Sequence, residues 1–320
     1  MKNLRIVFMG TPEFAVATLG ALLMNGYDVA CVVTAPDKPA GRGRKIIKSA
    51  VKEFAEISSL PILQPVNLKD PAFTAALEEF KADIFIVVAF RMLPRVVWKI
   101  PSIGTINLHA SLLPHYRGAA PINHAIINGE TATGVTTFFI DENIDTGKIL
   151  LTEETPIFPF ENAGDLHYRL MKLGARLMIR TLEGISDKTL KPTSQSEYIK
   201  QDRPPMPAPK IHPADCIINW DNDTIKIHNL IRGLSPSPCA RSFLRKDTTT
   251  FLLKIYESQP VPDSHDLKPG SIVSDGEHVI RIACSDGFIN VISLQLEGRK
   301  RLNNTEFLRG FKIADYKIVS

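Results

Sequence analysis

Short β-rich runs alternate with helical patterns through the first half of the chain. The strand candidates are Leu4–Met9, Val29–Thr34, Ile62–Leu63, Ile84–Ala89, Gly104–Ala110 and Gly134–Ile140. The helix candidates are Pro12–Asn25, Ala50–Ile57, Pro71–Phe80, Ala120–Asn128 and Asp165–Leu182. Because Ile84–Ala89 is apolar without alternation, it is typical of a strand buried on both faces. The rhythm predicts an α/β fold with a Rossmann-like, mostly parallel open sheet, whose ligands bind where strands end.

The second half of the chain follows a different pattern. At 320 residues the chain is longer than one compact domain usually is, so we expect two domains. Residues 190–210 are rich in proline, which is typical of a stiff, extended linker. One helical segment and several short strands follow, at Thr224–Arg232, Phe251–Tyr256, Ser271–Val273, Val279–Ala283 and Ile289–Leu296. They predict a smaller OB-like β-barrel domain, giving boundaries of 1–189, 190–210 and 211–320.

Composition and spacing exclude several classes of protein. Apolar residues make up 44% of the chain, but the longest clean apolar run, Ile84–Phe90, is too short to cross a bilayer. The four cysteines are scattered without ligand spacing, which argues against a disulfide framework or a zinc site. The turn after the first strand lacks the GxGxxG fingerprint, so dinucleotide-dependent hydride transfer is not expected. We expect a cytoplasmic monomer that uses no metal and has no membrane contact.

Two polar residues stand near the end of the strand candidate Gly104–Ala110. Asn107 and His109 are two positions apart, so they point to the same face of a strand, while Leu108 points to the other. Burying such a pair without partners costs about 1–3 kcal/mol, so the pair is either hydrogen-bonded or functional. The alternative interpretation is a core histidine with all its hydrogen bonds formed, beside an asparagine that ends the strand.

Asp145 follows the strand candidate Gly134–Ile140. Taken alone it is a turn aspartate, because Asp-Thr-Gly is ordinary turn chemistry. If both strands end at one edge of the sheet, an amide, an imidazole and a carboxylate meet in one cleft. That trio suits acyl transfer to an amine: Asn107 polarises the carbonyl, His109 stabilises the developing charge, and Asp145 holds the protonation state of the histidine and accepts a proton. Direct attack by the amine needs no Ser or Cys nucleophile.

A basic loop spans residues 36–48. Five basic residues share it with the single acid Asp37, namely Lys38, Arg42, Arg44, Lys45 and Lys48. Lysine and arginine on a loop can follow a nucleic-acid backbone, and Lys210 in the linker can extend this track. A solvated surface loop is the alternative, since a net charge of +4 does not by itself indicate a nucleic-acid partner.

Several runs in the chain match the motifs of one enzyme family. Asn107–Pro114 with Tyr116–Ile122 is similar to a formyltransferase signature, and Asp145–Gly147 is similar to the second catalytic motif of the same group. Further similar runs are the basic loop, Ala208–Ile211, Ile217–Trp220, Ile231–Pro238 and Leu294–Lys300. Together they resemble the methionyl-tRNA formyltransferase family of 10-formyltetrahydrofolate-dependent enzymes over nearly the whole chain.

The resemblance implies formyl transfer from 10-formyltetrahydrofolate to the free α-amine of methionyl initiator tRNA. It implies that Asn107 and His109 stabilise the oxyanion and that Asp145 supports them. The folate-contacting residues that it implies are Ser111, Leu112, Leu113, Pro114, Phe90 and Arg91. The tRNA-binding residues that it implies are Lys38, Arg42, Arg44, Lys45, Lys48 and Lys210, with a contribution from the C-terminal domain.

The chain departs from the family pattern in two places. Phe90-Arg91 stands where Tyr-Gly is common, so Arg91 can contact the pterin or pair with carboxylates of the glutamyl tail. His115-Tyr116 replaces the more usual Arg-Trp pair. Two other functions stay open. A small-amine formyltransferase or 10-formyltetrahydrofolate hydrolase leaves the basic loop unexplained, and a non-catalytic RNA-binding protein leaves the catalytic trio unused.

Overall fold

The computed structural model describes residues 4–40, 45–199, 201 and 204–319. Arg42 and Arg44 of the basic loop lie outside the described residues, and so does the side chain of Lys45. The chain forms two compact units. Unit 1 comprises Met1–Gly118, Thr133–Thr155 and His167–Ala208, and unit 2 comprises Ala119–Ala132, Pro156–Leu166 and Pro209–Ser320.

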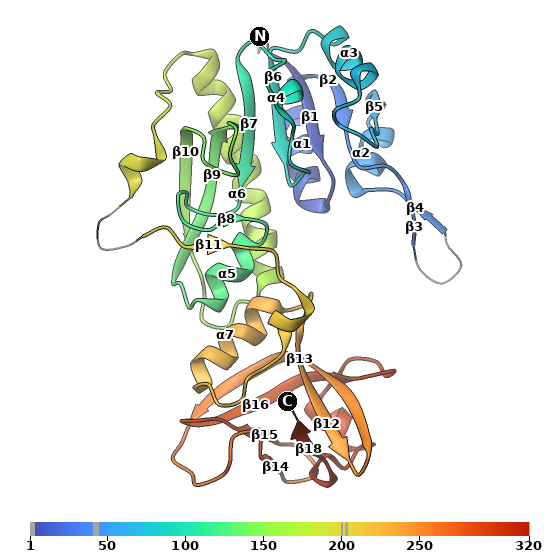
Figure 1. Ribbon diagram of the computed structural model, residues 1–320, viewed down its shortest axis with the longest axis vertical. Coiled ribbons are helices and arrows are strands. Elements are labelled where there is room, and N and C mark those ends of the chain that lie inside the picture. Colours follow the sequence, from blue (N-terminus) through green and yellow to red (C-terminus); the bar gives the residue numbers. More distant parts are fainter. Residues whose placement is uncertain (1–3, 41–44, 200, 202–203, 320) are drawn as a thin grey trace. The chain divides into compact units, whose positions relative to one another are not determined.

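The centre of unit 1 is a seven-stranded sheet, counted over the described residues (Figure 1). Its strands, in spatial order, are β10 (Ile149–Pro156), β9 (Ala132–Phe139), β7 (Gly104–His109), β6 (Ile84–Val88), β1 (Arg5–Gly10), β2 (Asp28–Val33) and β5 (Ile62–Leu63). Neighbours from β7 to β5 are parallel, whereas β9 runs antiparallel to β7. The predicted mostly parallel, Rossmann-like sheet is confirmed, with an antiparallel addition at one edge.

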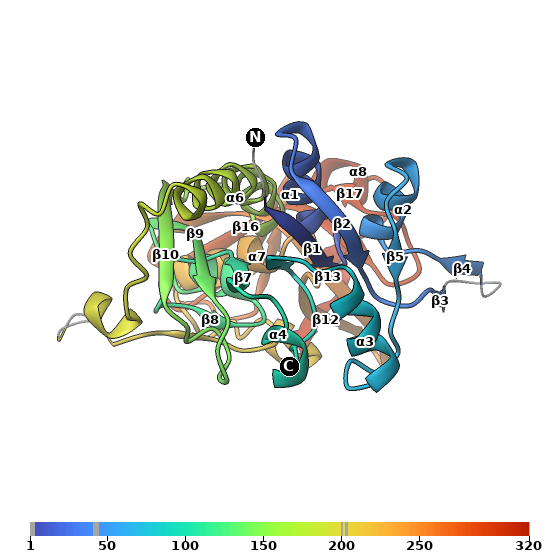
Figure 2. The same ribbon diagram turned by 90° about the horizontal axis from the view of Figure 1, so that it is seen from above.

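Helices cover both faces of this sheet. Figure 2 shows α1 (Glu13–Met24) and α6 (Ala163–Ser186) over one face, and α3 (Pro71–Glu79) and α4 (Arg95–Trp98) over the other. The short helix α2 (Ala50–Ile57) packs beside α1. Alternate residues of the central strands pack against α3 and α4. The strands contribute Val7, Met9, Phe85 and Val87, and the helices contribute Leu77 and Val97. Apolar side chains on both faces of β6 explain its uninterrupted apolar sequence.

Two small pairs of strands complete unit 1. The basic loop carries β3 (Lys38–Ala40) and β4 (Lys45–Ile47), which pair antiparallel. The segment predicted as a linker contains the 3-10 helix η1 (Gln195–Tyr198) and β11 (Pro207–Ala208). Figure 1 shows β11 beside β8 (Arg117–Gly118), with which it pairs in parallel. The proline-rich segment therefore folds onto unit 1 through hydrogen bonds.

Unit 2 is built on a curled antiparallel half-barrel, in agreement with the small β domain that was predicted. Its strands are β12 (Ala240–Lys246), β13 (Thr249–Pro262), β14 (Ile272–Ser274), β15 (Ile280–Ala283), β16 (Gly287–Leu296), β17 (Leu302–Asn303) and β18 (Lys317–Val319). Its helices are α5 (Pro121–Ile127), α7 (Thr224–Leu234), α8 (Asn304–Leu308), η2 (Pro213–Cys216) and η3 (Ile313–Asp315). Helix α5 packs on α7, where Gly233 lies against Ile127.

Several elements were not anticipated from the sequence. Strand β9 is antiparallel to β7, within a sheet that was predicted to be mostly parallel. Strands β10 and β12 were not predicted, because polar and charged residues interrupt both and leave no continuous apolar run. Among the described residues, no helix combines the length and the apolar character that crossing a bilayer requires.

Candidate active site

Strand β7 brings Asn107 and His109 to one face of the sheet. Asn107 is in register with Val87 of β6 and Phe138 of β9, and His109 is in register with Thr136. Leu108 points the other way, because a Cβ on Gly174 of α6 would lie 2.7 Å from its Cδ2 atom. Asn107 and His109 therefore face away from α6, as their spacing predicts.

His109 is hydrogen-bonded to one acceptor and lies near a second. Its side chain is 7% exposed, and its Nε2 atom lies 2.8 Å from the carbonyl oxygen of Tyr116. Because a carbonyl only accepts, Nε2 is the donor in this bond. Nδ1 lies 3.7 Å from Oδ2 of Asp145, beyond hydrogen-bond length. A ring protonated at both nitrogens has an acceptor near each N–H.

Asp145 lies in the turn after β9 and has a left-handed backbone, with φ of 55°. Its Oδ2 atom accepts a hydrogen bond of 2.9 Å from the backbone N–H of Gly118. The turn also needs glycine two residues later, because a Cβ on Gly147 would overlap the carbonyl oxygen of Phe139. The Asp-Thr-Gly motif is thus a tight turn that aims one carboxylate at the histidine.

The side chain of Asn107 is half-buried and forms no hydrogen bond with any residue that the structure describes. By contrast, the Nε2 atom of His109, on the same face, is already hydrogen-bonded to the Tyr116 carbonyl. A partly buried carboxamide without a protein partner can donate to an oxygen of a bound molecule. The carboxamide of Asn107 therefore fits the carbonyl oxygen of a formyl donor as a hydrogen-bond partner.

The loop that follows β7 is stabilised from within. Ser111 Oγ donates to the carbonyl of His115 over 2.7 Å, and Thr136 Oγ1 donates to the carbonyl of Ser111 over 2.7 Å. Leu113 packs against Phe138 and Ile149. Ser111, Leu113 and Pro114 are buried and Leu112 is half-buried. The side chains of Ser111 and Leu113 thus shape the loop, so a ligand here would meet its backbone and Leu112.

Arg91 ties together two loops at the carboxyl ends of β5 and β6. Its guanidinium donates to the carbonyl oxygens of Pro65 (2.6 Å) and Val66 (3.0 Å). It also lies 5.5 Å from the ring centre of Phe90. Arg91 is exposed, and its charge is not neutralised by these carbonyl groups. The sequence departure at this position therefore has a structural consequence, which is to hold the loop at residues 65–66.

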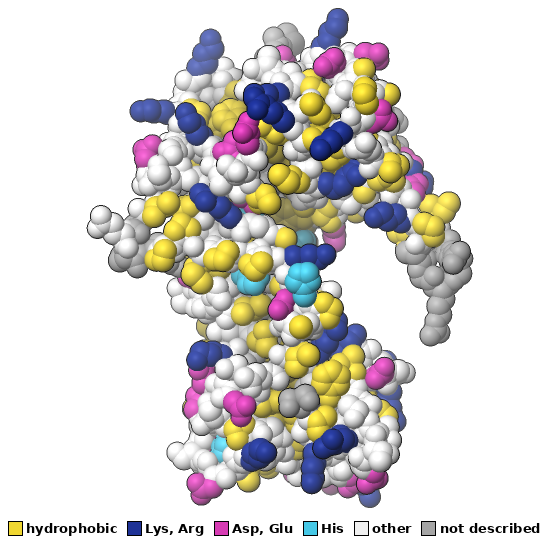
Figure 3. All heavy atoms as spheres, viewed as in Figure 1, with side chains coloured by type: hydrophobic (Ala, Val, Ile, Leu, Met, Phe, Trp, Pro, Cys, Tyr) yellow, Lys and Arg dark blue, Asp and Glu magenta, His cyan; other side chains and the backbone are white. Residues whose placement is uncertain are grey.

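The basic residues predicted to bind tRNA have different surroundings. Lys38 is exposed on β3, whereas Lys48 pairs with Glu56 over 2.7 Å, a bond that raises the pKa of Lys48. Lys210 is exposed in unit 2. On the face shown in Figure 3, basic and acidic side chains are interspersed over both units. The described residues thus bring the candidate trio to one face of the sheet, while the tRNA-binding role of the six basic residues stays a prediction.

The described residues form neither a reactive thiol site nor a metal site. All four cysteines are buried, and burial raises the pKa of the Cys31 and Cys284 thiols to about 12. No group of three or more His, Cys, Asp or Glu side chains among the described residues is placed to hold a metal ion.

Sequence reasoning missed the groups that hold the trio in place. The Tyr116 carbonyl and the Gly118 N–H contact His109 and Asp145 directly. Gln195, in η1, donates to the carbonyl oxygens of Asp145 (2.8 Å) and Gly147 (2.9 Å). Tyr116 and Gly118 lie inside the formyltransferase signature, so the signature could have pointed to them. No sequence signal pointed to Gln195, because it lies in a segment interpreted as a linker.

Comparison with known proteins places the chain in a family. The formyl transferase family model matches residues 4–182, and the model of the formyl transferase C-terminal domain matches residues 210–312. A methionyl-tRNA formyltransferase of Bacteroides thetaiotaomicron is 50% identical over 319 residues, covering 99% of both chains. One of Flavobacterium johnsoniae is 52% identical over 315 residues, covering 98% of both chains.

Solved structures share the fold at lower identity. An N-formyltransferase from Helicobacter canadensis, in complex with folinic acid and dTDP-3-aminofucose, matches with a TM-score of 0.65 and 22% identity, covering 90% of this chain and 98% of its own. A sugar 3N-formyl transferase matches with a TM-score of 0.64 and 22% identity, covering 93% and 99%. The family models and the full-length relatives show that this chain belongs to the formyl transferase family.

Proposed function

We propose that this enzyme transfers the formyl group of 10-formyltetrahydrofolate to the α-amine of methionyl initiator tRNA. The full-length relatives at about half identity, named methionyl-tRNA formyltransferases, support the choice of reaction. The observation that carries the chemistry is the arrangement at the end of β7. There the Asn107 carboxamide has no hydrogen-bond partner among the described residues, and His109 faces Asp145 at 3.7 Å.

In the proposed reaction the methionyl amine attacks the formyl carbon and forms the new C–N bond. The formyl oxygen becomes negatively charged, and the Asn107 carboxamide donates to it. Protonated His109 stabilises the same oxygen through Nδ1–H, because its Nε2 is hydrogen-bonded to the Tyr116 carbonyl. Asp145 balances the charge of the protonated histidine and takes the proton that leaves the amine, directly or through water. The bond to the folate nitrogen then breaks, and the proton that Asp145 took from the amine passes to that nitrogen, directly or through water.

The proposed folate site extends from this point over neighbouring loops. Phe90 and Arg91 follow β6, and the loop at residues 111–114 follows β7. Both segments leave the carboxyl ends of adjacent parallel strands, where ligands of such sheets bind. Arg91 keeps a positive charge at the rim, which suits the carboxylates of a glutamyl tail.

The proposed tRNA contacts begin with the exposed Lys38 and include Arg42, Arg44, Lys45, Lys48 and Lys210. These side chains suit contacts with phosphates, which position a nucleic acid without reading its sequence. The C-terminal half-barrel contributes further contacts in this proposal. We also infer that the enzyme works as a monomer in the cytoplasm, where charged tRNA enters translation.

The deciding experiment measures formyl transfer from 10-formyltetrahydrofolate to charged initiator tRNA. Free methionine and charged elongator tRNA serve as parallel acceptors. Rapid formylation of the initiator tRNA alone supports the proposed reaction and acceptor. Release of formate without formylated tRNA overturns the proposal in favour of a hydrolase, and formylation of a small amine overturns it in favour of a different transferase.

A further inference from the structure

A segment interpreted from sequence as a linker contacts the catalytic turn. Residues 193–208 begin with a bridge in which the Ile149 N–H donates to the Thr193 carbonyl over 2.8 Å, and the Thr193 N–H donates back over 2.9 Å. This bridge joins the segment to the start of β10, directly after the turn that carries Asp145. Helix η1 follows at once and places Gln195 in the interior, with 3% of its surface exposed.

The Gln195 carboxamide uses all of its hydrogen-bonding capacity. Nε2 donates to the carbonyl oxygens of Asp145 (2.8 Å) and Gly147 (2.9 Å). Oε1 accepts two bonds from Arg117, from Nε over 2.9 Å and from Nη2 over 2.6 Å. The orientation of the carboxamide is determined by chemistry, because arginine only donates and a carbonyl only accepts. Gln195 therefore connects the turn of Asp145 to the strand that ends at Gly118.

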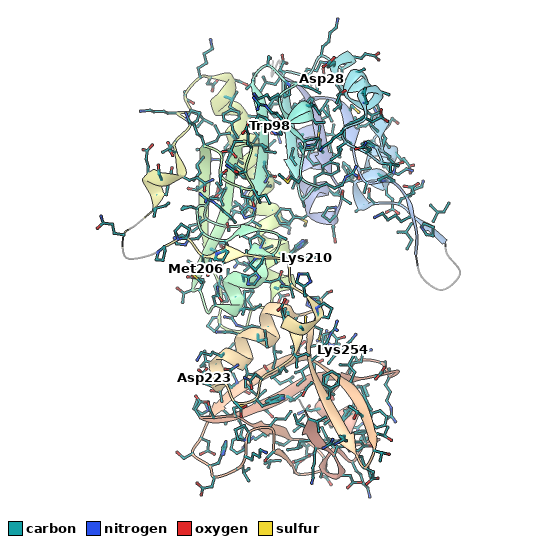
Figure 4. All side chains as sticks on the ribbon, in the orientation of Figure 1. Asp28, Trp98, Met206, Lys210, Asp223 and Lys254 are labelled. Atoms are coloured by element: carbon teal, nitrogen blue, oxygen red, sulfur yellow. The ribbon has the colours of Figure 1, made fainter. Side chains whose placement is uncertain are left out.

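The same segment then holds the opposite side of the site. The Met206 carbonyl accepts from the N–H of Tyr116, the residue whose own carbonyl receives His109. Strand β11 pairs with β8, which ends at Gly118, the donor to Asp145. Met206, labelled in Figure 4, comes directly before β11. Residues 206–208 thus hold Tyr116 and Gly118, which are the hydrogen-bond partners of His109 and Asp145.

We propose that Gln195 is a positioning residue that sets the distance between Asp145 and His109, with Arg117 anchoring its carboxamide. This inference rests on the proposed function, because it assigns Gln195 a part in the same reaction. Gln195 contacts the backbone of the turn and not the reacting atoms. Its loss would let the left-handed turn at Asp145 relax, which moves the carboxylate without removing it. A displacement of about 1 Å can lower a catalytic rate about 100-fold.

Two variants separate the donor and acceptor sides of the carboxamide. Gln195→Met removes both at nearly constant length. Gln195→Glu keeps the oxygen that accepts from Arg117 and removes only the N–H donors. It therefore serves as the test if Gln195→Met is unstable. The matched control is Gln201→Met, because Gln201 lies in the same segment and is exposed.

Steady-state formylation by the full chain is the first readout. We expect kcat to fall about 10- to 100-fold in both Gln195 variants, with KM for folate and for charged tRNA within about twofold of wild type. Gln201→Met is expected to match wild type. A folded Gln195 variant with wild-type kcat overturns the proposal. The proposal is also overturned if kcat falls and both KM values rise in proportion to the fall in melting temperature. That result indicates a structural role alone.

A second readout is independent of the substrates. The ring nitrogens of His109 are observed by 15N NMR at constant pH in the full chain without ligands. We expect their chemical shifts to change in both Gln195 variants and not in Gln201→Met. If they change while wild-type enzyme fails to formylate charged tRNA, positioning stands and the proposed function fails. If wild-type enzyme formylates tRNA and the shifts stay the same, the positioning proposal fails alone.

Discussion

The backbone N–H of Gly118 donates to Oδ2 of Asp145 over 2.9 Å, and this oxygen is the one that lies 3.7 Å from Nδ1 of His109. Three separate segments meet at this atom. Gly118 ends β8, Asp145 follows β9, and His109 ends β7. The carboxylate is therefore positioned by tertiary structure, and substitutions at the three residues have different expected effects.

Replacing Asn107 tests whether its carboxamide stabilises the oxyanion. We expect Asn107→Ala to lower kcat about 10²- to 10³-fold, as for the removal of one oxyanion donor. Stability should change little, because this side chain forms no hydrogen bond with the described residues. Single-turnover formylation and thermal denaturation measure the two effects. The control is Asn143→Ala, on an exposed loop position. Equal rates in the two variants would contradict the role.

The substitution Asp145→Asn removes the charge and keeps the shape. The oxygen of the new carboxamide can still accept from Gly118, so the fold should persist, while turnover falls about 10²-fold or more. His109→Ala should lose a similar factor. Because the two side chains act as a unit, the double variant should lose little more than either single one. A double variant whose loss equals the product of the single losses would show that the residues act independently.

Gly147 is expected to be essential for the turn of Asp145. A Cβ there would overlap the Phe139 carbonyl, so Gly147→Ala should destabilise the protein by about 1–3 kcal/mol and reduce turnover. Gly310→Ala is the matched control, because its Cβ would meet nothing within 4 Å. Urea denaturation of both variants measures the difference. Equal midpoints would mean that the turn adapts and that the tight geometry is not required.

Lysines of the basic loop should differ in their contribution to tRNA use. Lys38 is exposed, whereas Lys48 is paired with Glu56. We expect Lys38→Ala to raise KM for charged tRNA and to reduce the slope of log KM against log salt by about 1. Lys48→Ala should do less, because its charge is already partly balanced. Arg42→Ala and Lys45→Ala are expected from the sequence to act like Lys38→Ala. An unchanged salt slope in all four variants would identify an ordinary surface loop.

The thiols should be unreactive in the folded enzyme. Burial raises the pKa of Cys31 and Cys284 to about 12 and that of Cys239 to about 11, and it raises the pKa of Cys216 as well. Because the thiolate is the reactive form and each thiol is buried with a raised pKa, native protein at about pH 8 should resist iodoacetamide. Mass spectrometry should find no adduct, and formylation activity should persist. Rapid alkylation with loss of activity would show an accessible, functional thiol.

The sequence anticipated much of the architecture from local patterns. The apolar run of β6 predicted a doubly buried strand, and the two-residue spacing of Asn107 and His109 placed them on one face. Strand β10 was not predicted, because threonine and glutamate residues interrupt its apolar sequence. The contact of Arg91 with the folate stays a prediction, whereas the structure shows that Arg91 holds the loop at Pro65 and Val66.

By itself, the sequence determined the order of the two domains, the parallel sheet and the identity of the candidate trio. These properties follow from hydrophobic periodicity and motif spacing, which act over a few neighbouring residues. Only the tertiary structure decided what holds the trio. Gln195 lies 50 positions from Asp145 and 78 from Arg117, so their contacts depend on how a proline-rich segment returns to the sheet. Hydrogen bonds over such separations leave no periodic pattern in the sequence, because they form only when the fold brings the segments together.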